Sequence, residues 1–228
     1  MAQLLKCTSR KILKTGFERR DFSRTAKAHL MFDGNFRTGV DRIVRPVGRG
    51  LDRVGVSANA LTCVGLAMSV ACCILIGNGR LQLGLAFLIL TAVPDLLDGA
   101  VASAAGTSSK RGAFFDSTAD RVTDGLLLCG VAWHLAATEG GTIMVLPMAV
   151  LSVSALISYE RAKAELLGFD AKGGLMERAE RMVVLGFGLC FEALLIPVLW
   201  IMLGLTSLTA AQRFFKVWRQ ASDEVVNP

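Results

Sequence analysis

Apolar stretches of similar length follow one another through the last three quarters of the chain, separated by short polar breaks. Each stretch is close to the ~20 residues that a helix needs to cross ~30 Å of hydrocarbon. The breaks are rich in glycine and charge, as at 77–80 and 138–141. The pattern predicts six transmembrane helices, at about 58–77, 81–104, 112–137, 142–166, 178–193 and 195–218. We therefore expect an all-α integral membrane protein.

The stretch ahead of the first span has a different pattern. Apolar residues recur at helical spacing over 36–54, and arginines line much of the opposite face. This pattern is typical of an amphipathic helix that lies in the membrane interface. A soluble amphipathic helix packed on a globular core would look similar, but the spans that follow favour the interfacial helix. Ser57 is the expected N-cap of the first span.

We expect three parts along the chain. Residues 1–32 form a basic, flexible cytoplasmic tail, 33–220 form the membrane domain and 221–228 form a C-terminal tail. The N-terminal part lacks the long apolar core of a secretory signal. An Arg-rich transit peptide is an alternative, but a tail that binds anionic lipid fits the basic composition better.

Composition and charge add an orientation to this picture. The chain has 228 residues, 53% hydrophobic and 19% charged, which is too apolar for an ordinary soluble domain. A net charge of +6 is typical of proteins that bind nucleic acid or an anionic membrane. The apolar stretches favour the membrane, and we expect no nucleic-acid partner. Of the 25 Lys and Arg residues, only Arg80 falls on the side opposite the termini. Because basic loops stay in the cytoplasm, we expect a multi-pass cell-membrane protein whose termini and active site are cytoplasmic.

Four carboxylates interrupt the second and third predicted spans. Asp95 and Asp98 are spaced i, i+3, and Asp116 and Asp120 are spaced i, i+4, so each pair shares one face of its helix. The short turn between the spans makes the helices antiparallel neighbours, which would bring the four side chains together. Helix caps in headgroup water would explain one or two of them. Four carboxylates in one place predict a site for a hard divalent cation, Mg²⁺ or Mn²⁺.

These residues form the motif Asp-x2-Asp-Gly-x2-Ala-x9-Gly-x3-Asp-x3-Asp, which begins at Asp95 and ends at Asp120. The motif resembles the signature of the CDP-alcohol phosphotransferases, integral membrane enzymes of phospholipid synthesis. The chain departs from it at Ser103, where the family has Arg, so this position cannot supply the positive charge that Arg would bring to the nucleotide donor. The resemblance implies two Mg²⁺ ions per site, with Mn²⁺ as an alternative, held by Asp95, Asp98, Asp116 and Asp120. It also implies that Asp120 removes the proton of the acceptor hydroxyl.

The resemblance also implies the residues that bind the donor, CDP-diacylglycerol. They are Asn59, Ala60, Leu61, Thr62, Gly99, Ser103 and Ser109. Helix capping is the alternative role for Asn59 and Thr62. Asp124 continues the carboxylate face one turn further, either supporting the metal ligands or making a plain buried polar contact.

A second, basic constellation comes from three span ends on the side of the aspartates. Its members are Arg161, Lys163, Arg178, Arg181 and Arg213. Taken singly, Arg161–Glu165 and Glu177–Arg181 have the i, i+4 spacing of ordinary surface pairs. Taken together, the residues resemble the acceptor-phosphate pocket of the actinobacterial phosphatidylinositol-phosphate synthase branch, which has Lys-Ala-Arg where this chain has Arg161-Ala-Lys163.

The resemblance implies transfer of a phosphatidyl group from CDP-diacylglycerol to 1D-myo-inositol 3-phosphate (inositol 1-phosphate), with release of CMP. Glycerol 3-phosphate is the alternative acceptor with the same chemistry. An ion-coupled transporter is the alternative from another class, but it would place charges near the middle of the membrane and often in paired repeats. The expected partners are the donor, a phosphorylated polyol, membrane lipids and a second copy of the chain in a homodimer.

Overall fold

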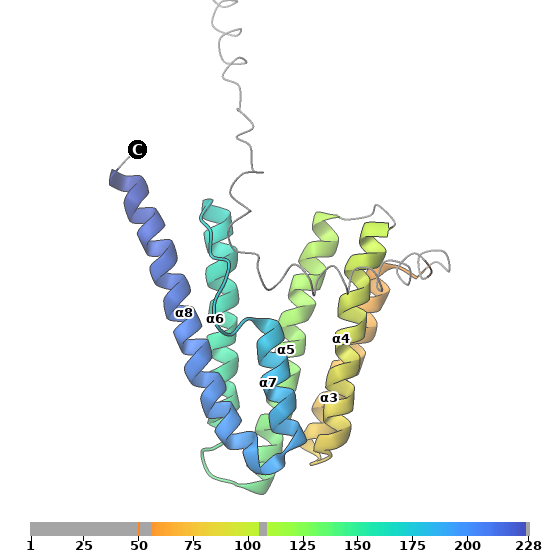
Figure 1. The fold of residues 1–228 in the computed structure, drawn as a ribbon. Coiled ribbons are helices and arrows are strands. Elements are labelled where there is room, and N and C mark those ends of the chain that lie inside the picture. Colours follow the sequence, from red (N-terminus) through yellow and green to blue (C-terminus); the bar gives the residue numbers. More distant parts are fainter. Residues whose placement is uncertain (1–49, 51–55, 105–108, 227–228) are drawn as a thin grey trace, which may run out of the picture. The chain divides into compact units, whose positions relative to one another are not determined.

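The computed structural model describes residue 50 and residues 56–104 and 109–226, and this part of the chain is helical (Figure 1). Apart from residue 50, the interfacial helix and basic tail expected before the first span lie outside the described residues. The first four helices are α3 (Ala58–Gly77), α4 (Leu81–Ala104), α5 (Lys110–Thr138) and α6 (Val145–Leu167). They are followed by α7 (Arg178–Cys190), the short 3₁₀ helix η1 (Glu192–Leu194) and α8 (Leu195–Val226).

The helices occupy the six predicted stretches, with shifts at their ends. The fifth stretch ends as a helix at Cys190, and α8 continues to Val226, past the predicted domain boundary at 220. Three helical segments of the described chain are long and apolar enough to cross a membrane: Ala58–Gly77, Val145–Leu167 and Glu192–Asp223. With three such segments, the chain is an integral membrane protein.

Polar side chains fix the starts of the helices that carry the site. The Ser57 hydroxyl accepts a hydrogen bond from the Ala60 N–H at 3.2 Å, which confirms it as the N-cap of α3. Ser109 caps α5 in the same way and accepts from the Gly112 N–H at 3.0 Å. The C-terminal end of α6 is set by Gly168, which adopts the left-handed conformation with φ 85°.

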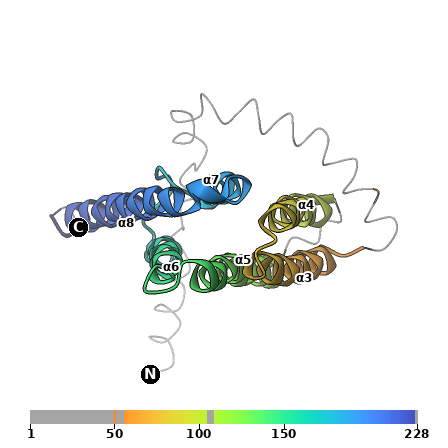
Figure 2. The ribbon, with the colours of Figure 1, turned by 90° about the horizontal axis from the view of Figure 1, so that it is seen from below.

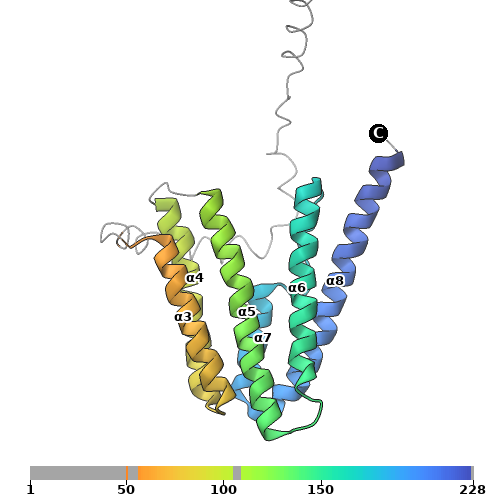
Figure 3. The same cartoon turned by 180° about the vertical axis from the view of Figure 1, so that it is seen from behind.

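The helices pack in two neighbouring groups, which are joined by the contact between α5 and α6 and by α7. α3 packs on both α4 and α5, and α6 packs mainly on α8 (Figure 3). Seen from below, α7 lies between α8 and α4 (Figure 2). The contact between α3 and α5 is close because α5 has Gly130 there: a Cβ at this position would lie 2.8 Å from the Cys73 carbonyl oxygen. Small residues commonly permit such contacts between membrane helices.

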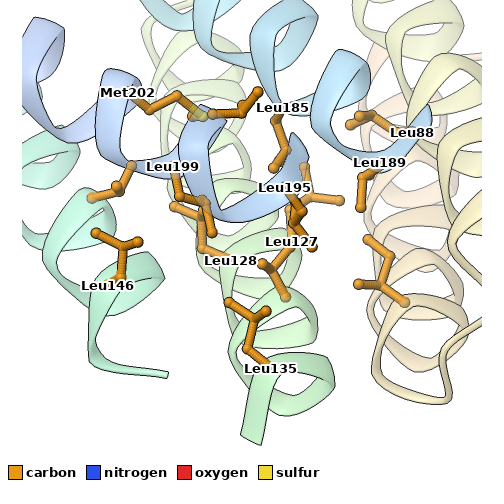
Figure 4. Packing of buried hydrophobic residues seen from close by; sticks show 14 of the residues in the cluster. Leu88, Leu127, Leu128, Leu135, Leu146, Leu185, Leu189, Leu195, Leu199 and Met202 are labelled. Carbon is orange, nitrogen blue, oxygen red and sulfur yellow. The ribbon is translucent and has the colours of Figure 1, made fainter. Parts of the chain in front are cut away.

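The apolar core brings together residues of α5, α7 and α8 and extends to α3, α4 and α6 (Figure 4). Leu127 on α5, Leu189 on α7 and Leu199 on α8 are each 0% exposed. Lipid tails are as apolar as leucine, so burying these leucine side chains between helices gains little from removal from water. Their close packing stabilises the helix contacts through dispersion. This core fixes α7 against α5, and α7 carries the arginines discussed below.

Candidate active site

A small cavity lies among α3, α4, α5 and α7. Its volume is about 30 Å³, which is room for one or two water-sized groups or small ions. Its lining combines carboxylates, threonines, one arginine and small or apolar residues. These are Thr62, Gly65, Leu66, Thr91, Pro94, Asp116, Ala119, Asp120, Thr123 and Arg178.

Asp116 and Asp120 both line this cavity because they lie one helical turn apart on the same face of α5. The Asp120 carboxylate forms an ion pair with Arg178, whose Nη1 is 2.9 Å from Oδ1. The Nη2 atom of Arg121 lies 3.7 Å from the other carboxylate oxygen. Asp120 is thus partly buried beside two guanidinium groups, at the junction of α5 and α7.

The other two predicted metal ligands lie in α4. Asp95 directly follows Pro94, which lines the cavity, and Asp98 comes about one turn later. The side chains of Asp95, Asp98 and Ser103, and the surroundings of Gly99, lie outside the described part of the structure. The backbone therefore places the Asp95–Asp98 segment in the helix that borders the cavity.

Asp124 joins the site to α7 as a buried polar contact. Its side chain is 5% exposed and receives two arginines, Arg178 Nε at 3.4 Å and Arg181 Nη2 at 3.2 Å. Arg181 is itself 5% exposed and also donates to the Met176 carbonyl at 3.4 Å. A buried charge is tolerated only when it is paired, and here each charge has an opposite partner.

The five basic residues predicted for the acceptor phosphate fall into different environments. Arg178 lines the cavity, whereas Arg181 is held by Asp124. Arg213 is 4% exposed and donates to the carbonyl oxygens of Gly173 and Ile157. Arg161 forms the expected surface pair with Glu165 at 3.0 Å, and Lys163 is exposed.

The Glu177–Arg181 pairing suggested by i, i+4 spacing is wrong. Glu177 instead accepts from Arg213 Nη2 at 2.9 Å, while Arg181 turns to Asp124. Both arginines find partners on other helices because they are buried, where local surface pairing does not decide the geometry.

The predicted donor residues that the structure describes lie at the ends of α3 and α5. Asn59 and Ala60 are exposed in the first turn of α3, and Leu61 is partly buried. Thr62 is buried and lines the cavity, and Ser109 caps α5. Sequence reasoning missed Thr91 and Thr123. The spacing of Thr123, three residues after Asp120 on the same helix face, was the available signal.

The side chains around the cavity suit a hard divalent cation. Asp116 and Asp120 supply carboxylate oxygens, and three threonines lie near them, Thr62, Thr91 and Thr123. Within the described residues, no group of three or more His, Cys, Asp or Glu side chains converges. The donors at the cavity are all oxygen, the type that Mg²⁺ and Mn²⁺ prefer, and α4 brings the Asp95–Asp98 segment to the same border.

Comparison with known proteins identifies the family that this chain resembles. The sequence model of one family, described as CDP-alcohol phosphatidyltransferase, matches residues 55–211. Phosphatidylinositol phosphate synthase of Mycobacterium tuberculosis is 32% identical over 192 residues, which are 80% of this chain and 88% of that protein.

Two crystal structures of a phosphatidylinositol phosphate synthase from M. tuberculosis have similar folds. The structure with CDP-DAG bound has a TM-score of 0.73 at 33% identity, and the match covers 78% of this chain and 94% of that chain. The structure in complex with manganese and citrate has a TM-score of 0.71 at 31% identity, covering 77% and 88%.

Proposed function

This chain belongs to the CDP-alcohol phosphatidyltransferase family, and from that premise we propose that it makes a phosphatidylinositol phosphate. The proposed reaction transfers the phosphatidyl group of CDP-diacylglycerol to inositol 1-phosphate and releases CMP. The observation that carries the proposal is the contact of 2.9 Å between Arg178 and Asp120. It places a cation suited to an acceptor phosphate beside the carboxylate suited to receive the acceptor's hydroxyl proton. Family membership favours this enzyme over an ion-coupled transporter.

In this proposal the four aspartates of the motif hold two Mg²⁺ ions, with Mn²⁺ as an alternative. When bound, the metal ions neutralise the donor diphosphate and favour the departure of CMP. The protein supplies the rest of the chemistry. Asp120 accepts the proton of the acceptor hydroxyl, whose oxygen forms a bond to phosphorus as the bond from phosphorus to the CMP oxygen breaks. The manganese in the M. tuberculosis relative supports a divalent ion.

The donor is proposed to bind where α3, α4 and α5 border the cavity. Thr62 lines the cavity and Asn59 is exposed one turn earlier on α3, so both have side chains suited to hydrogen bonds with the nucleotide. Gly99 and Ser103 in α4, and Ser109 at the start of α5, complete the proposed donor site with Ala60 and Leu61. The CDP-DAG in the relative's structure supports this donor class.

The acceptor phosphate is proposed to bind at Arg178, with Arg161 and Lys163 adding positive charge from the end of α6. Arg181 and Arg213 act on the same site through the position of α7, since their guanidinium groups are bonded to Asp124 and Glu177. An acceptor that carries a phosphate needs fixed cations here, because the aspartates would otherwise repel it. Free inositol would not require them.

We place this site on the cytoplasmic side of a six-span cell-membrane protein that forms a homodimer. All six apolar stretches would then cross the bilayer, α7 and η1 together forming the fifth. The charge distribution along the sequence supports the orientation.

The test is release of CMP from CDP-diacylglycerol by the purified protein, offered inositol 1-phosphate, glycerol 3-phosphate or free inositol. Inositol 1-phosphate should be used best, activity should require Mg²⁺ or Mn²⁺, and Arg178→Ala should raise the KM for the acceptor about ten- to a hundredfold. Arg80→Ala, on the opposite side of the membrane, is the matched control. Preference for glycerol 3-phosphate would retain the phosphate site and change the product, whereas preference for free inositol would refute the phosphate site.

A further inference from the structure

The loop between α6 and α7, residues 168–177, contacts α8 from Asp170 onward. It runs back beside α6 and α8 before α7 begins (Figure 1). Two of its residues are fully enclosed, Ala171 at 0% and Met176 at 1% exposure. A loop without helical hydrogen bonds must find other partners for its buried N–H and C=O groups.

One polar stripe on α8 supplies those partners. The stripe consists of Thr209, Arg213, Lys216 and Gln220, which are spaced four, three and four residues apart and therefore share a helix face. The surrounding residues of α8 are largely apolar up to Phe215.

The outer half of the stripe holds the first residues of the loop. The Gln220 amide accepts from the Asp170 N–H at 3.0 Å and donates to the Asp170 carbonyl at 2.8 Å. The Lys216 ammonium lies 2.9 Å from both the Asp170 carboxylate and the Lys172 carbonyl. The hydrogen bonds from Lys216 and from the Lys172 N–H lower the pKa of Asp170, so this carboxylate stays charged around neutral pH.

The inner half of the stripe holds the rest of the loop. Arg213 Nε donates to the Gly173 carbonyl at 2.9 Å, and the Thr209 hydroxyl accepts from the Met176 N–H at 3.0 Å. Gly174 has φ 147°, and a Cβ there would collide with the Thr209 methyl group. Loop positions 170, 172, 173 and 176 thus meet α8 positions 220, 216, 213 and 209 in antiparallel order.

The last contact of the stripe reaches the active site. Arg213 Nη2 binds Glu177, the residue at the start of α7, at 2.9 Å. The next residue is Arg178, which lies 2.9 Å from Asp120. A continuous series of contacts therefore links α8, through the loop and Glu177, to Arg178 at the cavity.

We propose that the polar stripe of α8 is a splint that sets where α7 begins and so positions Arg178 for the phosphate of the acceptor. The proposal rests on the proposed function. Lys216 and Gln220 are positioning residues in this account: they lie outside the cavity lining and act on acceptor binding through the loop. Their loss should weaken acceptor binding selectively, because the described hydrogen bonds of loop residues 170–177 run mainly to α8 and none of them reaches α3 or α4, which border the donor side of the cavity.

The test compares Lys216→Met and Gln220→Leu, singly and together, with Arg219→Met as the control. Arg219 is exposed on the same turn and makes none of the described contacts to the loop, so its variant removes a charge without removing the splint. Hydrogen exchange of the full-length protein reports on residues 170–177, and steady-state kinetics give separate KM values for CDP-diacylglycerol and inositol 1-phosphate.

In the double variant, exchange in the loop should be faster and the acceptor KM should rise about five- to tenfold, as expected for the loss of one or two hydrogen bonds to a charged or amide group. The donor KM should stay within about twofold of the wild-type value. Arg219→Met should match the wild type, and Lys216→Arg, which keeps a donor in place, should restore the acceptor KM.

Faster exchange with an unchanged acceptor KM would overturn the proposal, because the splint would then hold the loop without positioning Arg178. An equal rise in both KM values would also overturn it, since that pattern indicates general loosening. If the wild-type protein uses no phosphorylated acceptor, the proposed function itself fails. That failure is visible before any variant is made.

Discussion

At the scale of single residues, the surroundings of each aspartate on α5 depend on where along the helix it lies. Asp116, Asp120 and Asp124 follow one another at one-turn intervals, but their environments differ. Asp116 and Asp120 line the cavity, whereas Asp124 is buried against two arginines of α7. Three aspartates on one face of α5 can thus border the cavity at the start of the helix and hold α7 by ion pairs one turn further on.

Asp120→Asn should leave the protein folded and remove most of its turnover. The amide has nearly the same shape but cannot accept the hydroxyl proton, and loss of a general base typically costs about 10²–10⁴-fold in rate. The measurement is kcat for CMP release, with thermal unfolding as the check on folding. Asp223→Asn, an exposed aspartate near the end of α8, is the control. A folded Asp120→Asn protein with near-normal kcat would refute the role.

Asp124→Asn should instead lower stability. Removing one partner of a buried ion pair typically costs about 3–5 kcal/mol, because Arg181 would be left charged without its carboxylate. Thermal unfolding in detergent should show a clearly lower Tm, and Asp124→Glu should recover part of it by restoring the charge. An unchanged Tm for Asp124→Asn would mean that the two arginines do not depend on Asp124.

At the scale of helices, the sequence predicts positions well because each apolar stretch and each break has a local cause. Ser57 and Ser109 supply N-caps, and glycines with positive φ, such as Gly79 and Gly168, follow the helix ends. The stretch 178–193 was the least regular: its helix stops at Cys190 and a 3₁₀ turn follows.

The contacts between helices could not be predicted in the same way. The spacing of Glu177 and Arg181 suggests a local pair, yet their partners are Arg213 and Asp124, which are distant in the chain. The splint on α8 depends on hydrogen bonds across 33 to 50 residues of sequence. Periodicity identifies a polar stripe on a helix, but it does not say which loop that stripe binds.

The close contact between α3 and α5 gives a prediction at this scale. Gly130→Ala should destabilise the protein by about 1–3 kcal/mol, because its Cβ would lie 2.8 Å from the Cys73 carbonyl oxygen and the backbone of α3 would have to shift. Gly125→Ala on the same helix is the matched control: a Cβ there meets nothing within 4 Å. It should be neutral or slightly stabilising, since alanine favours the helix. Equal Tm values for the two variants would contradict the close packing.

At the scale of the whole molecule, charge decides how the described helices are placed in the bilayer. The breaks at 77–80 and 138–141 carry Arg80 and Glu139, whereas the loop at 168–177, the starts of α5 and α7 and the ends of α6 and α8 carry most of the described cations. An excess of Lys and Arg marks the cytoplasmic side. The loop that holds Arg178 in place should therefore face the cytoplasm.

Cysteine labelling tests this orientation in intact cells. In a cysteine-free background, Lys172→Cys should be protected from a membrane-impermeant thiol reagent, whereas Glu139→Cys should react. Both positions are exposed in the structure, so protection reports the side of the membrane and not burial. Permeabilising the cells should make Lys172→Cys react as well, which controls for the reactivity of that thiol. Labelling at Lys172→Cys with protection at Glu139→Cys would reverse the topology. It would also place Asp120, Arg178 and the loop away from the cytoplasmic pool of donor and acceptor that the proposed reaction requires.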